Sequence, residues 1–180
     1  MGWRKKLANQ NLEHFRALSR RAASCFSDDM TPSGRIEWIY HLISGDPDLG
    51  ASELEKLDRQ WTISGQPEDR YSLARVLQEL EDTQLVDGRA RAWGLLAVAW
   101  SRLTRGETPQ LAEMAAEALR LAQESGDESA KADAKCLLGD TFRASGNLVA
   151  AKAAYDEFQI IRRRLAERDP ENTGLQRDLA

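Results

Sequence analysis

Residues 131–170 read KADAKCLLGDTFRASGNLVAAKAAYDEFQIIRRRLAERDP, and this stretch decides the fold. Its apolar residues recur three and four positions apart, which is the spacing of one face of an α-helix. Gly146 interrupts the pattern, because glycine marks a turn where two helical segments meet. The stretch therefore predicts a helical hairpin, with one helix over 131–144 and a second over 148–167.

The layout of this hairpin is repeated earlier in the chain, at an offset of 42 residues between Leu96 and Leu138. Each copy pairs a small residue, where two backbones approach, with a large residue that fills the neighbouring gap. One hairpin cannot bury its apolar face alone, so such repeats predict a stack held together by neighbour contacts. The expected repeat-packing residues are Trp61, Leu96, Ala97, Trp100, Leu138, Gly139, Phe142, Gly146, Ala151 and Tyr155.

The N-terminal part of the chain also has helical patterns. An apolar stripe from Trp3 to Phe26 predicts one helix of about twenty residues. Thr31 followed by Pro32 predicts the start of the next helix, because proline is favoured at the first helical position. The turn-forming residues of 45–50 are expected to end that helix.

Helix signals continue to the end of the chain. Ser52 and Glu55 have the spacing of a capping box, which predicts a short helix that ends near Ile63. Further helices are expected over 67–85, 89–104 and 108–123. The predicted all-α organisation comprises N-terminal helices over 1–50, hairpins over 51–87, 88–128 and 129–170, and a partial helix at the C-terminus.

The composition is that of a globular domain. The 180 residues include 25 Lys and Arg against 29 Asp and Glu, a formal net charge of −4, and 42% are hydrophobic. No stretch approaches the roughly 18 apolar residues of a membrane span, and the N-terminus lacks a secretory signal pattern. These features predict a soluble, cytoplasmic protein. Cys25 and Cys136 are expected to be free, buried thiols rather than a disulfide.

This sequence contains few residue patterns that are typical of catalytic or metal-binding sites. Two histidines are present, and neither has the spacing of a zinc site. Cys25 and His41 are interpreted as a small apolar residue and a residue at a helix end rather than as a nucleophile pair. Glu79, Glu81 and Asp82 are interpreted as carboxylates on a solvated helix rather than as a glycosidase pair. We therefore expect no catalytic residue, no metal and no cofactor.

Charge is distributed unevenly along the chain. Residues 1–24 contain six basic residues against Glu13 alone, a net charge of +5. The preferred interpretation is a capping helix whose apolar stripe covers the first repeat and whose basic side is solvated. Docking on an anionic membrane surface is the alternative. Nucleic-acid binding is not expected, because the chain is acidic overall and its repeated aromatic residues are interpreted as packing wedges.

The repeated residues resemble the tetratricopeptide repeat family, in particular bacterial tandem arrays with a period of about 42 residues. The resemblance rests on Leu138-Gly139, Phe142, Gly146, Ala151 and Tyr155, closed by Pro170. It is strongest over 131–170 and weaker over 88–128 and 52–86, and Lys135 and Phe158 depart from the family pattern. The resemblance implies a right-handed superhelix of antiparallel helical hairpins, an α-solenoid.

The resemblance also implies a concave groove, lined by the first helix of each hairpin, that contacts a peptide. The Lys and Asn pairs with which some family members hold a terminal carboxylate are missing. Arg91, Arg102 and Arg143 are candidates to bind partner carboxylates, and the alternative is that they are solvated arginines. The implied groove positions are Glu55, Arg59, Thr62, Arg91, Val98, Ser101, Arg102, Asp133, Cys136, Asp140 and Arg143.

The functional prediction is a non-enzymatic scaffold that binds a segment of a partner protein in this groove. Two alternatives remain open: a secretion-type or holdase chaperone for a client protein, and a membrane-surface adaptor that works through residues 1–24. If the chain is cut from a longer array, the exposed face of its last repeat is expected to promote self-association.

Overall fold

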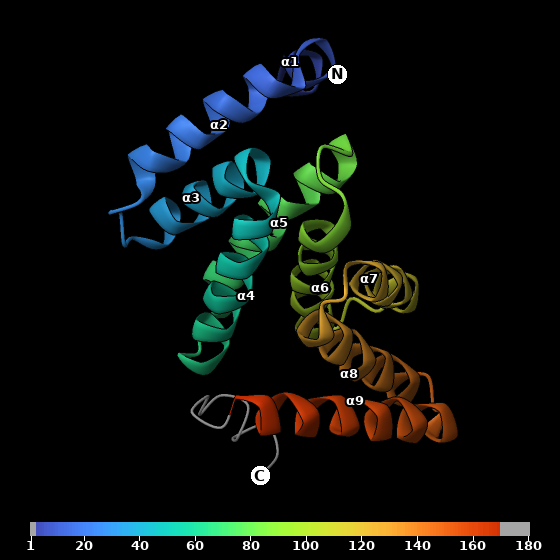
Figure 1. Cartoon of the computed structure of the whole chain (residues 1–180). Helices are drawn as coiled ribbons and strands as arrows, with labels where there is room; N and C mark the ends of the chain where they lie inside the picture. Colours follow the sequence, from blue (N-terminus) through green and yellow to red (C-terminus); the bar gives the residue numbers. More distant parts are fainter. Residues whose placement is uncertain (1–2, 170–180) are drawn as a thin grey trace.

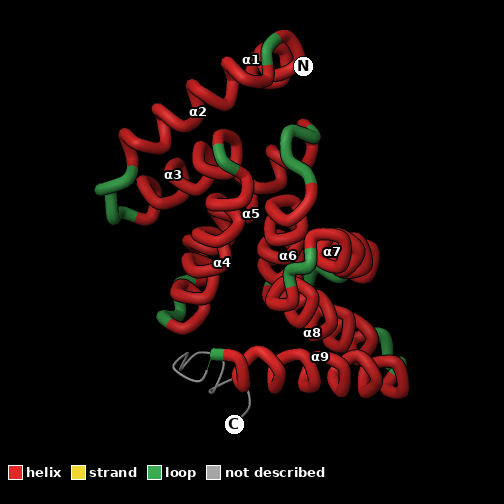
Figure 2. The backbone as a smooth tube through the Cα atoms, viewed as in Figure 1, coloured by secondary structure: helices red, strands yellow, loops and turns green. Residues whose placement is uncertain are grey.

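The computed structural model describes residues 3–169, and all regular structure in that range is helical (Figures 1 and 2). The all-α prediction is confirmed. The predicted C-terminal partial helix and Pro170 lie outside the described residues. The helices are α1 (Trp3–Gln10), α2 (Leu12–Phe26), α3 (Pro32–Gly45), α4 (Pro47–Ile63), α5 (Pro67–Thr83), α6 (Gly88–Thr104), α7 (Leu111–Ser125), α8 (Glu128–Ala144) and α9 (Leu148–Arg168).

The N-terminal stripe forms two helices, so the prediction of one continuous helix was wrong. Asn11 separates α1 from α2, because its extended backbone and its side chain, which accepts from the His14 N–H at 2.9 Å, cap a new helix. Phe15 and Ala23 of α2 are buried, and α2 packs against α3 rather than against the predicted repeats. The apolar stripe of α2 is thus buried against α3.

The start of α3 agrees with the prediction, whereas the start of α4 does not. Thr31 caps α3, and Pro32 is its first residue. Asp46 is the only residue between α3 and α4, and its carboxylate accepts from the Leu49 N–H at 3.2 Å, so α4 begins at Pro47. The predicted capping box is wrong, because Ser52 already lies inside α4 and donates to the Asp48 carbonyl.

Two later boundaries also differ from the sequence prediction. Gln110 has a left-handed backbone (φ 64°), and α7 begins after it rather than at the predicted Thr108-Pro109. Asp127 caps α8 through the Ala130 N–H at 2.9 Å, so the helix begins at Glu128, three residues before its predicted start. In both places a cap or turn geometry decides the boundary where the apolar pattern cannot.

Consecutive helices pack on one another along the chain, and α4 and α8 both contact α6 (Figure 1). One hydrophobic core runs from Ile36 in α3 to Leu137 in α8. The predicted repeat residues Trp61, Leu96 and Ala97 belong to it. Within the described residues helices α3 to α8 therefore pack around one shared core.

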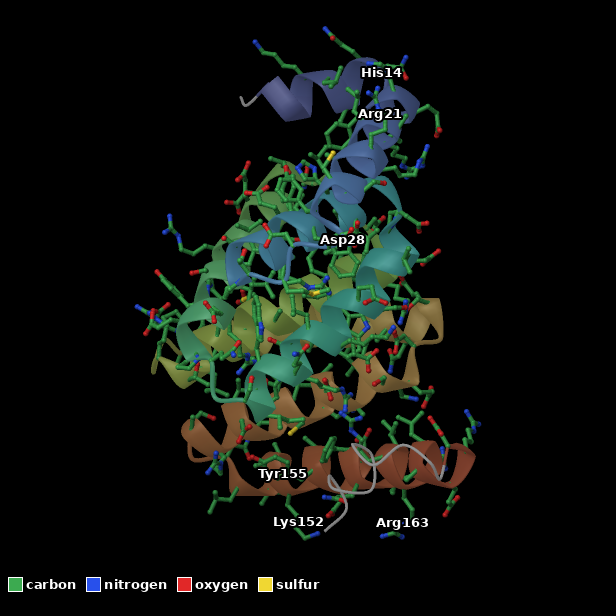
Figure 3. The ribbon with its side chains drawn as sticks, turned by 90° about the vertical axis from the view of Figure 1, so that its left-hand side faces the viewer. His14, Arg21, Asp28, Lys152, Tyr155 and Arg163 are labelled. Carbon is green, nitrogen blue, oxygen red and sulfur yellow. The ribbon has the colours of Figure 1, made fainter. Side chains whose placement is uncertain are left out.

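The last hairpin shows the predicted pairing of a small and a large residue. An ideal Cβ on Gly139 would lie 2.4 Å from the ring of Tyr155, so glycine is needed for α9 to approach α8. Ala151 is buried in the same interface, and Gly146 forms the turn with φ 79°. Lys152 and Arg163 project from the outer side of α9 (Figure 3).

A polar junction fixes α4, α6 and α8 relative to one another. Asp127 accepts from Arg89 at 2.6 Å and from the indole N–H of Trp93 at 2.9 Å. Arg89 also donates to the Asp48 carbonyl and to the Ser52 hydroxyl. Burial acts to raise the pKa of Asp127, but the hydrogen bonds outweigh it and the pKa is lowered. The junction holds three helices in the positions that shape the candidate site.

Candidate functional site

A cleft opens between α4 on one side and α8 and α9 on the other, with α6 at its base. It contains two adjoining cavities of about 500 and 810 Å³, and Arg59 and Ile63 line both. The C-terminal end of α9 lies below the C-terminal end of α4 in Figure 1, which closes this side of the molecule. We call this surface the α4–α9 cleft; its apolar lining residues are Ile63, Trp100, Phe158 and Leu165.

The wall formed by α4 is held by two sets of polar contacts. Asp58 accepts two hydrogen bonds from Arg70 of α5, at 2.9 and 3.1 Å. Ser129 at the start of α8 donates to Glu55 at 2.7 Å and accepts from Arg59 at 3.2 Å. Arg59 also donates to Glu55 at 3.2 Å. These bidentate and bridging contacts orient the charged side chains of the cleft.

The wall formed by α8 and α9 contains a buried ion pair. Arg162 is only 3% exposed and donates to Asp133 of α8. Its guanidinium also lies 5.5 Å from the centre of the Phe158 ring, a cation–π distance. Fully buried arginines are rare unless paired, so this pair is a fixed part of the wall.

Burial raises the pKa of Asp133 from its ordinary value of 3.8 to about 6. Arg162 and Arg59 act to lower it, while the nearby carboxylates of Glu55 and Asp58 act to raise it. The direction reflects the low polarity of the wall, where the ionised carboxylate loses solvation.

This raised pKa gives a pH prediction. Between about pH 4 and pH 6 the folded chain holds a proton on Asp133 that the unfolded chain has released. The contribution of Asp133 to stability therefore increases as the pH falls through 6. Relative to Asp133→Asn, the wild type is expected to gain about 1.4 kcal/mol between pH 8 and pH 5, because pH 5 lies one unit below the folded pKa of about 6. Urea unfolding of both proteins across this range measures the difference, and parallel profiles would contradict the prediction.

The structure brings some of the predicted groove residues together. Arg59, Thr62, Asp133 and Cys136 all line the 500 Å³ cavity of the α4–α9 cleft. Glu55 lines the adjoining 810 Å³ cavity. These five positions come from α4 and α8, two helices that the prediction assigned to the groove.

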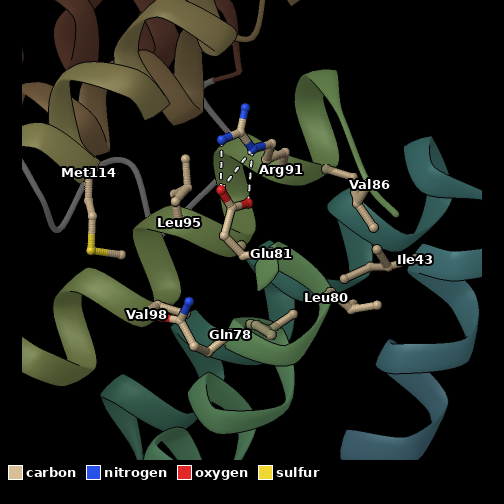
Figure 4. Close-up of a pocket in the computed structure, with 12 residues that line it drawn as sticks. Ile43, Gln78, Leu80, Glu81, Val86, Arg91, Leu95, Val98 and Met114 are labelled. Carbon is tan, nitrogen blue, oxygen red and sulfur yellow. Dashed lines mark hydrogen bonds and ion pairs between the residues drawn. The ribbon is translucent and has the colours of Figure 1, made fainter. Parts of the chain in front are cut away.

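Arg91 and Arg102 lie elsewhere, between α5, α6 and α7. Arg91 forms a bidentate pair with Glu81, with distances of 2.7 to 3.1 Å (Figure 4). It also contacts Glu117 of α7 at 2.9 Å. Arg102 donates to Gln78 of α5 at 2.9 Å. The cavity beside Arg91, which Val98 also lines, has a volume of about 20 Å³, room for roughly one water molecule. These arginines connect helices within the chain.

The remaining predicted positions are also separate from the cleft. Arg143 and the hydroxyl of Tyr155 both donate to Asp140, at 2.7 and 2.8 Å, near the outer end of α8. Ser101 is buried within α6. The structure thus separates Arg143, which pairs with Asp140 of its own helix, from Arg91 and Arg102, which are held by residues of α5 and α7.

Three smaller interpretations need correction. Cys25 is a free cysteine as expected, but it is exposed rather than buried, since it lies off the face that α2 packs on α3. His41 lies within α3, where its ring stacks on Phe26 with 6.0 Å between centres, and it is not a terminal residue. Glu81 is half-buried against Arg91, so it is not solvated as expected, whereas Glu79 and Asp82 are exposed.

Sequence reasoning did not assign several lining residues of the cleft to a site, among them Ile63, Phe158 and Arg162. Ile63 was treated only as the end of a helix, although it is 66% exposed at the mouth. Phe158 and Arg162 were noted only as parts of repeat patterns. A signal was present, because positions 158, 162 and 165 share one helical face with the buried Ala151 and Ala154.

Within residues 3–169, no group of three or more His, Cys, Asp or Glu side chains could hold a metal ion. None of the helices in that same range is long and apolar enough to cross a membrane. No protein-family model and no curated protein matches this sequence.

Proposed function

We propose that this chain is a non-enzymatic interaction module that binds a segment of a partner protein in the α4–α9 cleft. The proposal includes the tetratricopeptide-like superhelix and the cytoplasmic location expected from the sequence. The packing of α4 and α8 on α6 supports it, because those helices would form the inner layer of such a stack.

The observation that carries the proposal is the combination of volume and lining in the cleft. Its two cavities, of about 500 and 810 Å³, are large enough for several side chains of a peptide. Trp100 and Phe158 form half-buried aromatic walls, and Ile63 presents a large apolar side chain to solvent. Aromatic and apolar anchors surrounded by oriented charges are typical of protein-binding surfaces.

Replacing Ile63 by aspartate tests this function. The substitution puts a charge at the mouth of both cavities and should weaken partner binding by about tenfold or more, because an apolar contact is lost and a charge is desolvated. Folding should be unaffected, since the side chain is 66% exposed. The measurement is affinity capture from lysate of the source organism, followed by titration of the captured protein against wild type and variant.

Ile160→Asp is the matched control, because Ile160 is 50% exposed on α9 and does not line the cleft. A partner that binds the control normally and Ile63→Asp weakly supports the proposal. Equal binding by wild type, Ile63→Asp and Arg59→Glu would refute it.

A further inference from the structure

The larger cavity of the α4–α9 cleft is basic, although the chain as a whole carries a net charge of −4. Glu55 is engaged there, because it accepts hydrogen bonds from Ser129 at 2.7 Å and from Arg59 at 3.2 Å. Positive charge is therefore in excess at this opening, which favours an anionic group of a ligand. We call it the basic cavity; its charged lining residues are Lys56, Arg59, Arg168, Glu55 and Asp169.

Arg168 is a cation of the basic cavity whose donors are unused. It is exposed in the last turn of α9, and its guanidinium forms no hydrogen bond or ion pair with any residue in the described range 3–169. On the opposite wall, Lys56 pairs at 2.7 Å with Glu53, which does not line the cavity. An exposed pair of this kind contributes little to stability and can be exchanged for a ligand carboxylate. Both walls of the basic cavity thus present a cation to a ligand.

The smaller cavity of the cleft differs from the basic cavity in its chemistry. Trp100 and Phe158 line it, so we call it the aromatic cavity. Its two acidic lining residues are already paired with arginines, Asp58 with Arg70 and Asp133 with Arg162. With aromatic walls and neutralised carboxylates, this cavity is suited to a large apolar side chain.

Helix α9 sets the distance between these two kinds of contact. Phe158 and Arg168 lie ten positions apart in α9, and each residue rises 1.5 Å, so they are roughly 15 Å apart along its axis. An extended peptide covers this distance with about four or five residues, and a helical peptide with about ten. Ile63 lines both cavities and is 66% exposed, so it offers an apolar contact to a segment that reaches from one cavity to the other.

We infer that the α4–α9 cleft selects a peptide segment with a large apolar residue, which enters the aromatic cavity, and an acidic residue, which binds Arg168. The inference rests on the proposed function and specifies the ligand of that site. The aromatic walls favour an apolar side chain through the area that it buries, and a planar guanidinium forms paired hydrogen bonds with a carboxylate. A basic segment would meet like charge in the basic cavity, which selects against it.

Selection from a random peptide library tests the inference. Peptides of about 16 residues, displayed on phage, are selected on the immobilised full chain, because this length spans the two contacts even as a helix. The selected sequences should contain a large apolar residue with Asp or Glu about four or five positions away in an extended peptide, or about ten in a helical one. Selection on the Arg168→Glu chain should lose this acidic residue and favour Lys or Arg in its place.

Titration of one selected synthetic peptide measures the contact. Arg168→Glu should raise its dissociation constant about tenfold or more, because repulsion replaces a charge-assisted hydrogen bond. Arg163→Glu is the matched control, since it makes the same charge change on the outer side of α9, away from the cleft lining, and should leave the constant unchanged (Figure 3). When the acidic residue of the peptide is replaced by Lys, the Arg168→Glu chain should bind it more tightly than the wild type does.

The possible outcomes separate this inference from the proposed function. Peptides that need Ile63 but contain no acidic residue, or that bind the Arg168→Glu and Arg163→Glu chains equally well, overturn the inference and leave the proposed function standing. Peptides whose binding is unchanged by Ile63→Asp contradict both, because they bind outside the cleft. A library that yields no binder overturns the inference as well. Thermal melts of each variant establish that these exposed substitutions leave the fold intact.

Discussion

Replacing Arg162 by alanine is expected to lower the free energy of unfolding by about 3–5 kcal/mol at pH 7. The guanidinium is 3% exposed, lies over the Phe158 ring and donates to Asp133. Its removal leaves the Asp133 carboxylate in the wall of the cleft near Glu55 and Asp58, whose negative charges oppose its ionisation. The loss should appear as a lower midpoint in urea, with little change in the slope of the transition.

Arg163→Ala is the control, since Arg163 is the adjacent residue, is exposed and projects away from the helices (Figure 3). It should change stability by no more than about 0.5 kcal/mol. The cost of Arg162→Ala should shrink at pH 5, where Asp133 is protonated and needs a counter-ion less. If Arg162→Ala is as mild as the control at pH 7, the ion pair does not hold α9 on α8.

Local sequence signals explain why the helical elements could be predicted from the sequence. Thr31-Pro32 located the start of α3, and the expected pairing of a small with a large residue in each hairpin is made in the last one by Gly139 and Tyr155. Both are local rules, one for a helix cap and one for packing across a short turn. Such rules act over a few residues and do not depend on the rest of the fold.

The same local rules gave wrong boundaries where two signals competed. Ser52 with Glu55 and Asp46 with Pro47 both have the composition of a helix start. The structure uses Asp46, because a single residue is enough to redirect the chain between α3 and α4. Ser52 and Glu55 serve instead as partners for Arg89 and Ser129 across the stack. The sequence alone does not show which of those helices lie close enough for such contacts.

The candidate cleft could be predicted only in part for the same reason. Periodicity identifies which face of a helix is apolar, but not which distant helix covers that face. Arg91 pairs with residues 10 and 26 positions away, and Arg102 with one 24 positions away, so both are held between α5, α6 and α7 and not in the α4–α9 cleft. Arg59 does reach the cleft, because Ser129 of α8, 70 positions away, holds it there. Long-range partners decide which charged residues remain available to a ligand.

Gly50→Ala is expected to lower the free energy of unfolding by about 3 kcal/mol, because α3 and α4 touch at this residue. An added Cβ would lie 2.6 Å from the backbone N and Cα of Ile43, and backbone atoms cannot rotate away as a side chain can. The helices would have to separate around the core residue Ile43, which is 1% exposed. Thermal unfolding followed by circular dichroism measures the change.

Gly94→Ala is the matched substitution with the opposite expected sign. Gly94 lies inside α6 beside the cavity of about 20 Å³, and nothing lies within 4 Å of a Cβ added there. Alanine should stabilise the protein by about 1 kcal/mol, because it favours the helix more than glycine does. The same substitution thus measures the cost of a close backbone contact at Gly50 and the gain in helix propensity at Gly94. If Gly50→Ala stabilises the chain as Gly94→Ala should, the α3–α4 contact is looser than the structure indicates.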